Sequence, residues 1–364
     1  MPQQNVHLIA AARPNFMKIA PLYHALAQES WARPRIVHTG QHYDANMSEA
    51  FFRDLRLPQP HFNLDVGSGT HAEQTAGVML GYEKVVARER PDWIVVVGDV
   101  NSTAACAIVG AKAWIPVVHL EAGLRSGDRR MPEEINRLVT DAICDVLWTP
   151  SRDADENLLR EGVPAARIDR VGNIMIDSLE LMRASIESDG TRRGLGLDGD
   201  DYAVVTLHRP SNVDDAGTLG ALVRQLLEAS RRLRLVFAVH PRTRKRLEEF
   251  RLAELLASGR IVTTEPLPYV PFMNLVLRAR AVITDSGGIQ EESTYLGIPC
   301  LTLRENTERP ITVTEGTNRL VRAEDLCTQI AQVLAGRWPT GRRPELWDGR
   351  TAQRCVAALR RRMI

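Results

Sequence analysis

Short apolar runs alternate with longer amphipathic stretches along the whole chain, and this alternation constrains the fold more than any other feature. The runs expected to be β-strands span 6–10, 35–38, 93–97, 117–119, 146–149, 168–171, 203–206, 235–239, 261–263, 281–284 and 300–303. Helical periodicity lies between them, for example at 15–28, 153–161 and 216–231. Nearly continuous apolar strands joined by helices are buried on both faces, so the pattern predicts an α/β protein with parallel sheets.

The length of 364 residues favours about two domains, because single hydrophobic cores rarely grow that large. A stretch rich in Gly, Asp and Arg, ESDGTRRGLGLDGDD at 187–201, indicates a linker. The predicted domains are residues 1–175 and 176–349. Residues 194–199 match GxGxxG formally, but they precede a strand instead of following one, so we reject a dinucleotide site there.

Composition excludes several classes of protein. The net charge of +1 argues against a nucleic-acid-coating surface. No apolar stretch approaches the roughly 18 residues of a membrane span, and the first residues lack the charged and apolar regions of a secretion signal. The five cysteines stand singly, as expected of reduced thiols and not of a zinc site. We therefore expect a cytoplasmic protein without nucleic-acid or membrane partners.

Ionisable and turn-forming residues follow most of the predicted strands. Ligands of open α/β sheets bind at the carboxyl ends of strands, so this placement predicts a site there. The first half supplies Arg13, Lys18, Asp99, Glu121, Glu133 and Glu134. The second half supplies His208, Arg209, His240, Arg242, Arg304, Glu308 and Arg309. A turn cap is as good an interpretation of His42 and His240 as a ligand role, and Glu134 is interpreted as an acid at a helix start.

The motif TDSGGIQEEST at 284–294 predicts an anion site. A strand followed by a Gly-rich turn and a helix leaves free backbone N–H groups at the positive end of the helix dipole. Ser286, Gly287 and Gly288 are the expected phosphate-binding residues, and Glu292 is placed to bind two ribose hydroxyls. Together with the carboxylates of the first half, the motif predicts a substrate with a diphosphate and a polar group that reacts.

Blocks distributed over residues 12–318 resemble the non-hydrolysing UDP-N-acetylglucosamine 2-epimerases. The blocks are ARPNFMKIAPL, TGQHYDANMS, GDVNST, HLEAGLRSGDRRMPEEINR, VGNIMIDSL, TLHRPSN, TDSGGIQEES and RENTERPITVTEGTN. The resemblance implies the glycosyltransferase-B architecture, with two Rossmann-like domains facing across a cleft. It also implies a homodimer, a C-terminal helix (350–364) that joins the first domain, and a reaction without a metal or other cofactor.

The activity implied by this resemblance is reversible C2 epimerisation of UDP-N-acetylglucosamine to UDP-N-acetylmannosamine, by elimination and re-addition of UDP through a 2-acetamidoglucal. The first domain would carry the acid and base carboxylates, and the second would bind UDP. The implied catalytic residues are Asp99, Glu121, Glu133 and His208. The implied UDP-binding residues are Arg13, Lys18, Phe272, Ser286, Gly287, Gly288, Glu292 and Arg309.

The sequence departs from the family pattern at several points. Ala11 and Ala12 replace a Gly-Thr pair, and Pro210 and Ser211 follow His208-Arg209 where many members have Arg-Glu. The stretch QHYDANMS at 41–48 differs from members with an activating second substrate, so we expect activation to be weak or absent. A 2-epimerase of UDP-2,3-diacetamido-2,3-dideoxy-glucuronate, a glycosyltransferase, a nucleotide-sugar sensor and a hydrolysing epimerase remain alternatives.

Overall fold

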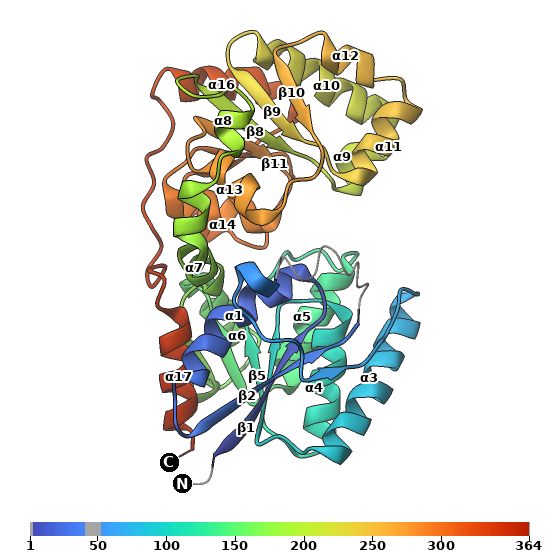
Figure 1. The fold of residues 1–364 in the computed structure, drawn as a ribbon, viewed down its shortest axis with the longest axis vertical. Helices are drawn as coiled ribbons and strands as arrows, with labels where there is room; N and C mark the ends of the chain where they lie inside the picture. Colours follow the sequence, from blue (N-terminus) through green and yellow to red (C-terminus); the bar gives the residue numbers. More distant parts are fainter. Residues whose placement is uncertain (1–2, 41–51, 364) are drawn as a thin grey trace. The chain divides into compact units, whose positions relative to one another are not determined.

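Two parallel β-sheets organise the chain, one in each of two compact units of a computed structural model (Figure 1). The structure describes residues 3–40 and 52–363. The first unit comprises Met1–Leu181 and Glu345–Ile364, and the second comprises Met182–Pro344. The predicted α/β class with parallel sheets is therefore confirmed.

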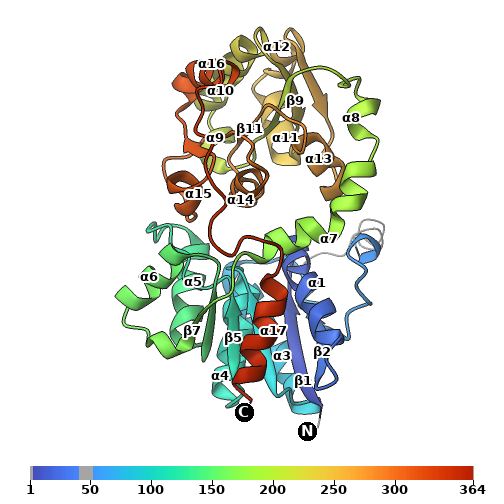
Figure 2. The same ribbon diagram turned by 90° about the vertical axis from the view of Figure 1, so that its left-hand side faces the viewer.

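In the described part of the first unit, the sheet has seven strands in the order β3-β2-β1-β4-β5-β6-β7. The strands are β1 (Gln4–Ala10), β2 (Ala32–His38), β3 (Phe62–Asn63), β4 (Trp93–Val97), β5 (Val117–Leu120), β6 (Val146–Thr149) and β7 (Ile168–Arg170). The helices are α1 (Arg13–Ala27), α3 (His71–Arg88), α4 (Asn101–Lys112), α5 (Pro132–Ile143), α6 (Arg152–Arg160) and α17 (Thr351–Arg361), and α7 (Ile174–Ser188) continues from the first unit into the second. Helix α17 packs beside α1, which Figure 2 shows.

The second unit has a sheet of six strands in the order β10-β9-β8-β11-β12-β13. Its strands are β8 (Tyr202–Thr206), β9 (Arg234–Ala238), β10 (Ile261–Thr264), β11 (Ala281–Thr284), β12 (Cys300–Thr302) and β13 (Asn318–Leu320). Its helices are α8 (Thr191–Gly194), α9 (Pro210–Val213), α10 (Ala216–Ser230), α11 (Pro241–Glu249), α12 (Ala253–Ala257), α13 (Tyr269–Val276), α14 (Gly287–Leu296), α15 (Ile311–Thr314) and α16 (Leu326–Leu334).

Each unit has its own hydrophobic core. Strands such as β4, with the sequence WIVVV, are buried along their whole length, because helices cover both faces of a parallel sheet. One cluster of the first unit centres on Ile94, Val96 and Val117, and the second unit buries Val205, Phe237 and Ile283. In the described residues, no helix is both long enough and apolar enough to cross a membrane.

The order of strands reverses once in each sheet, between β1 and β4 and between β8 and β11. Such a reversal sends the two following loops to opposite faces and opens a crevice at the carboxyl ends of the strands, where ligands of α/β proteins bind. The predicted domain boundary at 175/176 lies inside α7, and the two units divide at Leu181 and Met182. The rejected GxGxxG stretch precedes β8, as its position in the sequence indicated.

Candidate functional site

Lys18 and Glu121 form an ion pair at the strand reversal of the first unit. Lys18 lies on α1, which follows β1, and Glu121 directly follows β5. Gly98, after β4, has a φ of +72°, and a Cβ at this position would lie 3.2 Å from Lys18 Nζ and 3.6 Å from Glu121 Oε2. Glycine therefore leaves room for the pair. The Asn15 side chain closes this corner by donating a hydrogen bond to the Val97 carbonyl, 3.1 Å away.

Two residues of helix α5 hold Asp99 in place by hydrogen bonds. The Arg137 guanidinium donates to Asp99 Oδ2 at 3.0 Å, and the Asn136 amide donates to the Asp99 carbonyl at 2.9 Å. Arg137 also pairs with Glu134, whose carboxylate accepts N–H groups of the loop that precedes α5, including that of Gly127 at 2.9 Å. Arg137 thus orients the carboxylate of Asp99, and Glu134 in turn holds Arg137 in place.

Glu134 is an acid at a helix start, and it also makes buried contacts with Arg137 and with the loop before α5. Its carboxylate is buried and accepts hydrogen bonds from the backbone N–H of Ser126 and Gly127. Burial raises the pKa of Glu134, but these N–H groups and Arg137 lower it, and the net pKa lies below its usual value. A helix-start position in the sequence could not reveal these tertiary contacts.

Glu133 and Arg13 are exposed at the first turns of their helices. Arg13 begins α1, and Glu133 follows Pro132 at the start of α5. The structure therefore brings Lys18 to Glu121 and joins Asp99 to α5. Within residues 3–40 and 52–363, no hydrogen bond or ion pair joins Glu133 to Asp99 or Glu121, so its acid/base role stays a prediction.

In the second unit, the first turn of α14 has the form of an anion site. Ser286 is the N-cap residue, but its side chain makes no capping hydrogen bond to the helix, so its hydroxyl remains available. A Cβ at Gly287 would lie 2.7 Å from Arg309 Nη1 and from Glu308 Oε1, whereas a Cβ at Gly288 would meet nothing within 4 Å. Gly287 thus lets an arginine reach the start of the helix, and Gly288 leaves that start open.

Arg309 belongs to a buried charge network. Glu308 pairs with Arg309 and lies 2.7 Å from the Arg304 guanidinium and 4.0 Å from that of Arg209. Burial raises the pKa of Glu308, but Arg309 and Arg304 lower it more, so the net pKa lies well below its usual range. Arg309 also pairs with Glu291 at 2.9 Å, so two carboxylates hold its guanidinium beside the N-terminus of α14.

His208 is oriented by Asp285. Its Nδ1 lies 2.8 Å from Asp285 Oδ1, and the same carboxylate accepts the backbone N–H groups of His208 and Arg209 at 3.0 and 2.9 Å. Burial raises the pKa of Asp285, but these contacts lower it, and the net pKa lies below its usual value. With Nδ1 occupied, the Nε2 atom of His208 is the one available to a ligand. His240 caps α11 by accepting the Arg242 N–H.

Glu292 lies within α14 and is buried, with the Tyr269 hydroxyl donating to Oε1 at 2.6 Å. Burial raises the pKa of Glu292 to about 8, against an opposing effect of Tyr269. Phe272, on the same helix as Tyr269, is partly buried. Glu292 and Phe272 thus come from neighbouring elements of one unit, as a nucleoside site requires.

The sequence analysis missed Asn15, Asp285, Arg137 and the buried pair of His119 and Asp141. Asp285 directly follows a predicted strand and could have been found from that position. Asp141 lies in the middle of α5 and gave no such signal. Among the described residues, no cluster of three or more His, Cys, Asp or Glu could hold a metal ion, and the independence from metals and other cofactors stays a prediction. The stretch 41–48, on which the activation prediction rests, lies outside the described residues.

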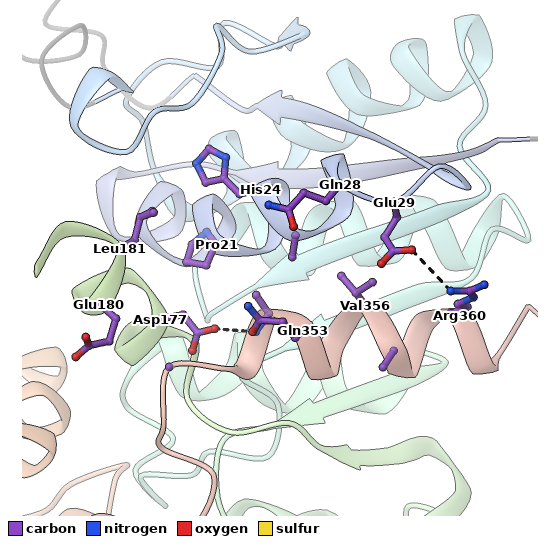
Figure 3. A pocket seen from close by; sticks show the side chains of 14 residues that line it. Pro21, His24, Gln28, Glu29, Asp177, Glu180, Leu181, Gln353, Val356 and Arg360 are labelled. Carbon is purple, nitrogen blue, oxygen red and sulfur yellow. Dashed lines mark hydrogen bonds and ion pairs between the residues drawn. The ribbon is translucent and has the colours of Figure 1, made fainter.

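A pocket of about 430 Å³ lies elsewhere in the first unit, between α1, α7 and α17 (Figure 3). His24, Asp177 and Gln353 line it, and Glu29 and Arg360 approach each other at 3.8 Å along its edge. Asp177 accepts the backbone N–H of Ala352 at 2.8 Å and so caps the start of α17. None of the predicted site residues lines this pocket.

Comparison with known proteins places these features in a family context. Residues 24–360 match the model of the UDP-N-acetylglucosamine 2-epimerase family. A UDP-N-acetylglucosamine 2-epimerase of Methanocaldococcus jannaschii is 44% identical over 86% of this chain and 87% of its own length. The UDP-2,3-diacetamido-2,3-dideoxy-D-glucuronate 2-epimerase of Pseudomonas aeruginosa is 39% identical over 90% and 92%. The chain is also similar to the crystal structure of the M. jannaschii UDP-GlcNAc 2-epimerase in complex with UDP-GlcNAc and UDP, with a TM-score of 0.88 and 41% sequence identity. This match covers 98% of this chain and 99% of that one.

Proposed function

Because the chain belongs to the UDP-N-acetylglucosamine 2-epimerase family, we propose that it interconverts UDP-N-acetylglucosamine and UDP-N-acetylmannosamine by epimerisation at C2. One observation carries the proposal: an open helix N-terminus with an adjacent arginine lies in the same chain as carboxylates held at the strand reversal of the other unit. A diphosphate leaving group and a proton to be moved require these two kinds of site. The M. jannaschii relative, in complex with UDP-GlcNAc and UDP, supports this choice of substrate.

The second unit is proposed to bind UDP. Ser286, Gly287 and Gly288 direct N–H groups and a hydroxyl at the diphosphate, and Arg309 adds a guanidinium. Glu292 binds the ribose hydroxyls, and Phe272 packs on the uracil. Arg13 and Lys18 complete the UDP-binding set from α1.

Departure of UDP drives the chemistry that we propose. The C2 hydrogen is barely acidic, so its loss must accompany cleavage of the anomeric C–O bond, which gives a 2-acetamidoglucal and UDP. Preorganised N–H groups and positive charge stabilise the leaving diphosphate, often the largest catalytic contribution. His208, oriented through Nδ1 by Asp285, presents Nε2 to this leaving group.

Inversion at C2 requires a proton to leave one face and arrive on the other. UDP then adds back to the glucal, and the new C2–H bond fixes the manno configuration. Asp99, Glu121 and Glu133 are the proposed acid and base groups, and the contact with Lys18 holds the Glu121 carboxylate in position. A positioned acid or base contributes about 10²–10⁴-fold in rate.

The deciding experiment is ¹H NMR of the purified protein with UDP-N-acetylglucosamine in D₂O, without added metal or cofactor. We expect a second anomeric signal from the manno isomer and deuterium at C2 of both isomers. Free UDP that accumulates in proportion to turnover would indicate a hydrolysing enzyme instead. Consumption of the sugar nucleotide only in the presence of an acceptor would indicate a glycosyltransferase.

A second candidate substrate is UDP-2,3-diacetamido-2,3-dideoxy-D-glucuronate, because the P. aeruginosa 2-epimerase of that sugar is 39% identical over 90% of this chain. The same NMR assay with both substrates compares their kcat/KM values directly. We also propose a homodimer, as the family resemblance implies, and light scattering of the purified protein tests it.

A further inference from the structure

We propose that the buried pair of His119 and Asp141 is a positioning pair that holds the two loops carrying Asp99 and Glu121. The inference rests on the proposed function, because it assigns these loops to the acid/base chemistry. Neither His119 nor Asp141 is exposed enough to touch a substrate. Their effect must therefore pass through the backbone that they hold.

The His119 ring joins β5 to the loop after β4. Its Nε2 lies 2.8 Å from the Gly98 carbonyl, and its Nδ1 lies 2.6 Å from Asp141 Oδ1. A carbonyl oxygen only accepts hydrogen bonds, so Nε2 carries a proton. Gly98 directly precedes Asp99 in the sequence. The ring thus ties the backbone before Asp99 to helix α5.

The second oxygen of Asp141 holds the loop after β5. Oδ2 accepts the Gly123 N–H at 3.0 Å and lies 2.7 Å from the Arg125 guanidinium. Glu121 lies between His119 and Gly123, two residues from each. One carboxylate therefore fixes the chain on both sides of Glu121 and, through His119, the backbone next to Asp99.

The loop after β5 needs such support because the backbone of Glu121 is strained. Gly98, Glu121 and Gly123 have φ values of +72°, +77° and +81°. A left-handed conformation at a non-glycine residue such as Glu121 costs about 1–3 kcal/mol and persists only where the surroundings enforce it. The hydrogen bonds of the pair act on the residues that flank this strained position.

The negative charge of Asp141 favours a fixed geometry of the pair. Burial raises the pKa of Asp141, but His119 and Arg125 lower it, and the net pKa lies below its usual value. An ionised Asp141 accepts hydrogen bonds through both oxygens, so one carboxylate can hold the His119 ring and the Gly123 N–H together. Glu161 pairs with the outer side of Arg125 at 2.7 Å and so holds the guanidinium that contacts Asp141.

The test compares Asp141→Ala and Asp141→Asn with the wild type in the C2 deuterium-exchange assay. The matched control is Tyr82→Phe, which removes another buried hydrogen bond of the first unit, from the Tyr82 hydroxyl to the His7 ring at 3.1 Å. We expect Asp141→Ala to lower kcat about 10²-fold with KM changed less than about threefold, because a displacement of about 1 Å can have that effect. Asp141→Asn keeps an acceptor for Gly123 and should lose less than about tenfold. Tyr82→Phe should keep the wild-type kcat.

An unchanged kcat in folded Asp141→Ala, or an equal loss in Tyr82→Phe, would overturn the proposal and leave only a structural role. If Asp141→Ala does not fold, His119→Gln replaces it, since a single amide cannot reach both Gly98 and Asp141. Amide hydrogen exchange provides a measurement that does not depend on activity. It should accelerate at 98–100 and 121–125 in the Asp141 variants and stay unchanged there in Tyr82→Phe; unchanged exchange in both loops would contradict the proposal. A wild-type protein that exchanges no C2 hydrogen would refute the proposed function, whereas the loop exchange still tests the pair.

Discussion

At the scale of single residues, Glu121 combines a strained backbone with a carboxylate that contacts Lys18. Its φ is +77°, and its carboxylate is paired with Lys18 where little water reaches. Both groups come from segments that follow strands next to the reversal of the sheet. A residue kept in such a conformation is typical of a functional position, because packing alone would favour an unstrained one.

Replacement of Glu121 by Gln keeps the size of the side chain and removes its charge and its basicity. We expect kcat for C2 epimerisation to fall about 10²–10⁴-fold, the usual contribution of a positioned acid or base. UDP affinity, measured by calorimetry, should change less than kcat, because most of the proposed UDP-binding residues lie in the other unit, although Lys18 loses its charged partner. The control is Glu156→Gln, which removes an exposed ion pair with Arg152 and should leave kcat unchanged. Equal kcat values for Glu121→Gln and the wild type would remove Glu121 from the mechanism.

Glu292 makes the stability of the protein depend on pH. Its pKa is raised to about 8 in the folded state, so the folded protein keeps a proton that the unfolded chain loses near pH 4.5. The contribution of this proton to the free energy of unfolding is fully present below the unfolded pKa of 4.5, and it is lost as pH rises through the folded pKa of about 8. An amide at this position cannot ionise. Glu292→Gln should therefore gain at least about 1 kcal/mol relative to the wild type between about pH 6 and pH 9.

Urea unfolding of the ligand-free protein at several pH values measures this gain, with Glu156→Gln as the control for a lost surface charge. If the free energy of unfolding varies with pH in the same way for the wild type and Glu292→Gln, the Glu292 carboxyl is already ionised at neutral pH.

The sequence predicted the chemical types of the site residues better than their partners. Lys18, Asp99, Glu121 and His208 could be selected because they follow apolar strands. The pairings of Asp99 with Arg137 and of His208 with Asp285 join residues that are distant in the sequence. A single sequence contains no signal for such contacts, because they depend on how the strands are ordered in the sheet.

At the scale of secondary-structure elements, the two glycines at the start of α14 differ in their surroundings, so one tests packing and the other tests ligand binding. Gly287 is enclosed by Arg309 and Glu308, whereas a Cβ at Gly288 would point into open space. Gly287→Ala should destabilise the ligand-free protein by about 1–3 kcal/mol through overpacking. Gly288→Ala should be neutral or stabilising by up to about 1 kcal/mol, since Ala favours a helix over Gly.

Isothermal calorimetry with UDP then tests the anion site. If the diphosphate lies on the first turn of α14, Gly288→Ala weakens UDP binding by at least about tenfold, or about 1.4 kcal/mol, although the fold is intact. Unchanged UDP affinity in a fully folded Gly288→Ala would place the diphosphate elsewhere.

Helix α17 depends on a cap supplied by another helix. Asp177 of α7, labelled in Figure 3, accepts the Ala352 N–H. The N-cap residue of α17, Arg350, makes no side-chain capping bond. Asp177→Ala should lower the unfolding free energy by about 0.5–2 kcal/mol, whereas Asp177→Asn retains an acceptor and should lose less. Urea unfolding measures both, and limited proteolysis shows whether α17 becomes accessible. Equal stability of Asp177→Ala and the wild type would mean that water caps α17 as well as Asp177 does.

The predicted strands of both sheets are confirmed, and those at 93–97, 146–149 and 281–284 have the predicted bounds. These strands are central and buried, so their apolar runs are uninterrupted. The strands β3 and β13 were not predicted, because two or three residues at the edge of a sheet contain no readable periodicity.

At the scale of the whole molecule, the two units are proposed to share the work on one substrate. UDP should therefore slow amide hydrogen exchange at 284–296 and 304–309 in the second unit and at 13–18 in the first. Mass spectrometry of exchange with and without UDP measures the three regions together, and α10 is an internal control. Slowing confined to the second unit would remove Arg13 and Lys18 from the UDP-binding set.

The first unit is made of two segments of the chain, one before and one after the second unit in the sequence. Helix α17, in the later segment, packs on α1, in the earlier one. During translation, the ribosome releases all of the second unit before it releases α17. All residues of the second unit are synthesised in one continuous stretch, whereas the α1 surface of the first unit has no α17 to cover it until residues 351–361 are made. The segment that completes the proposed acid/base unit is thus made after the whole of the second unit, and a nascent chain interrupted before residue 351 lacks it.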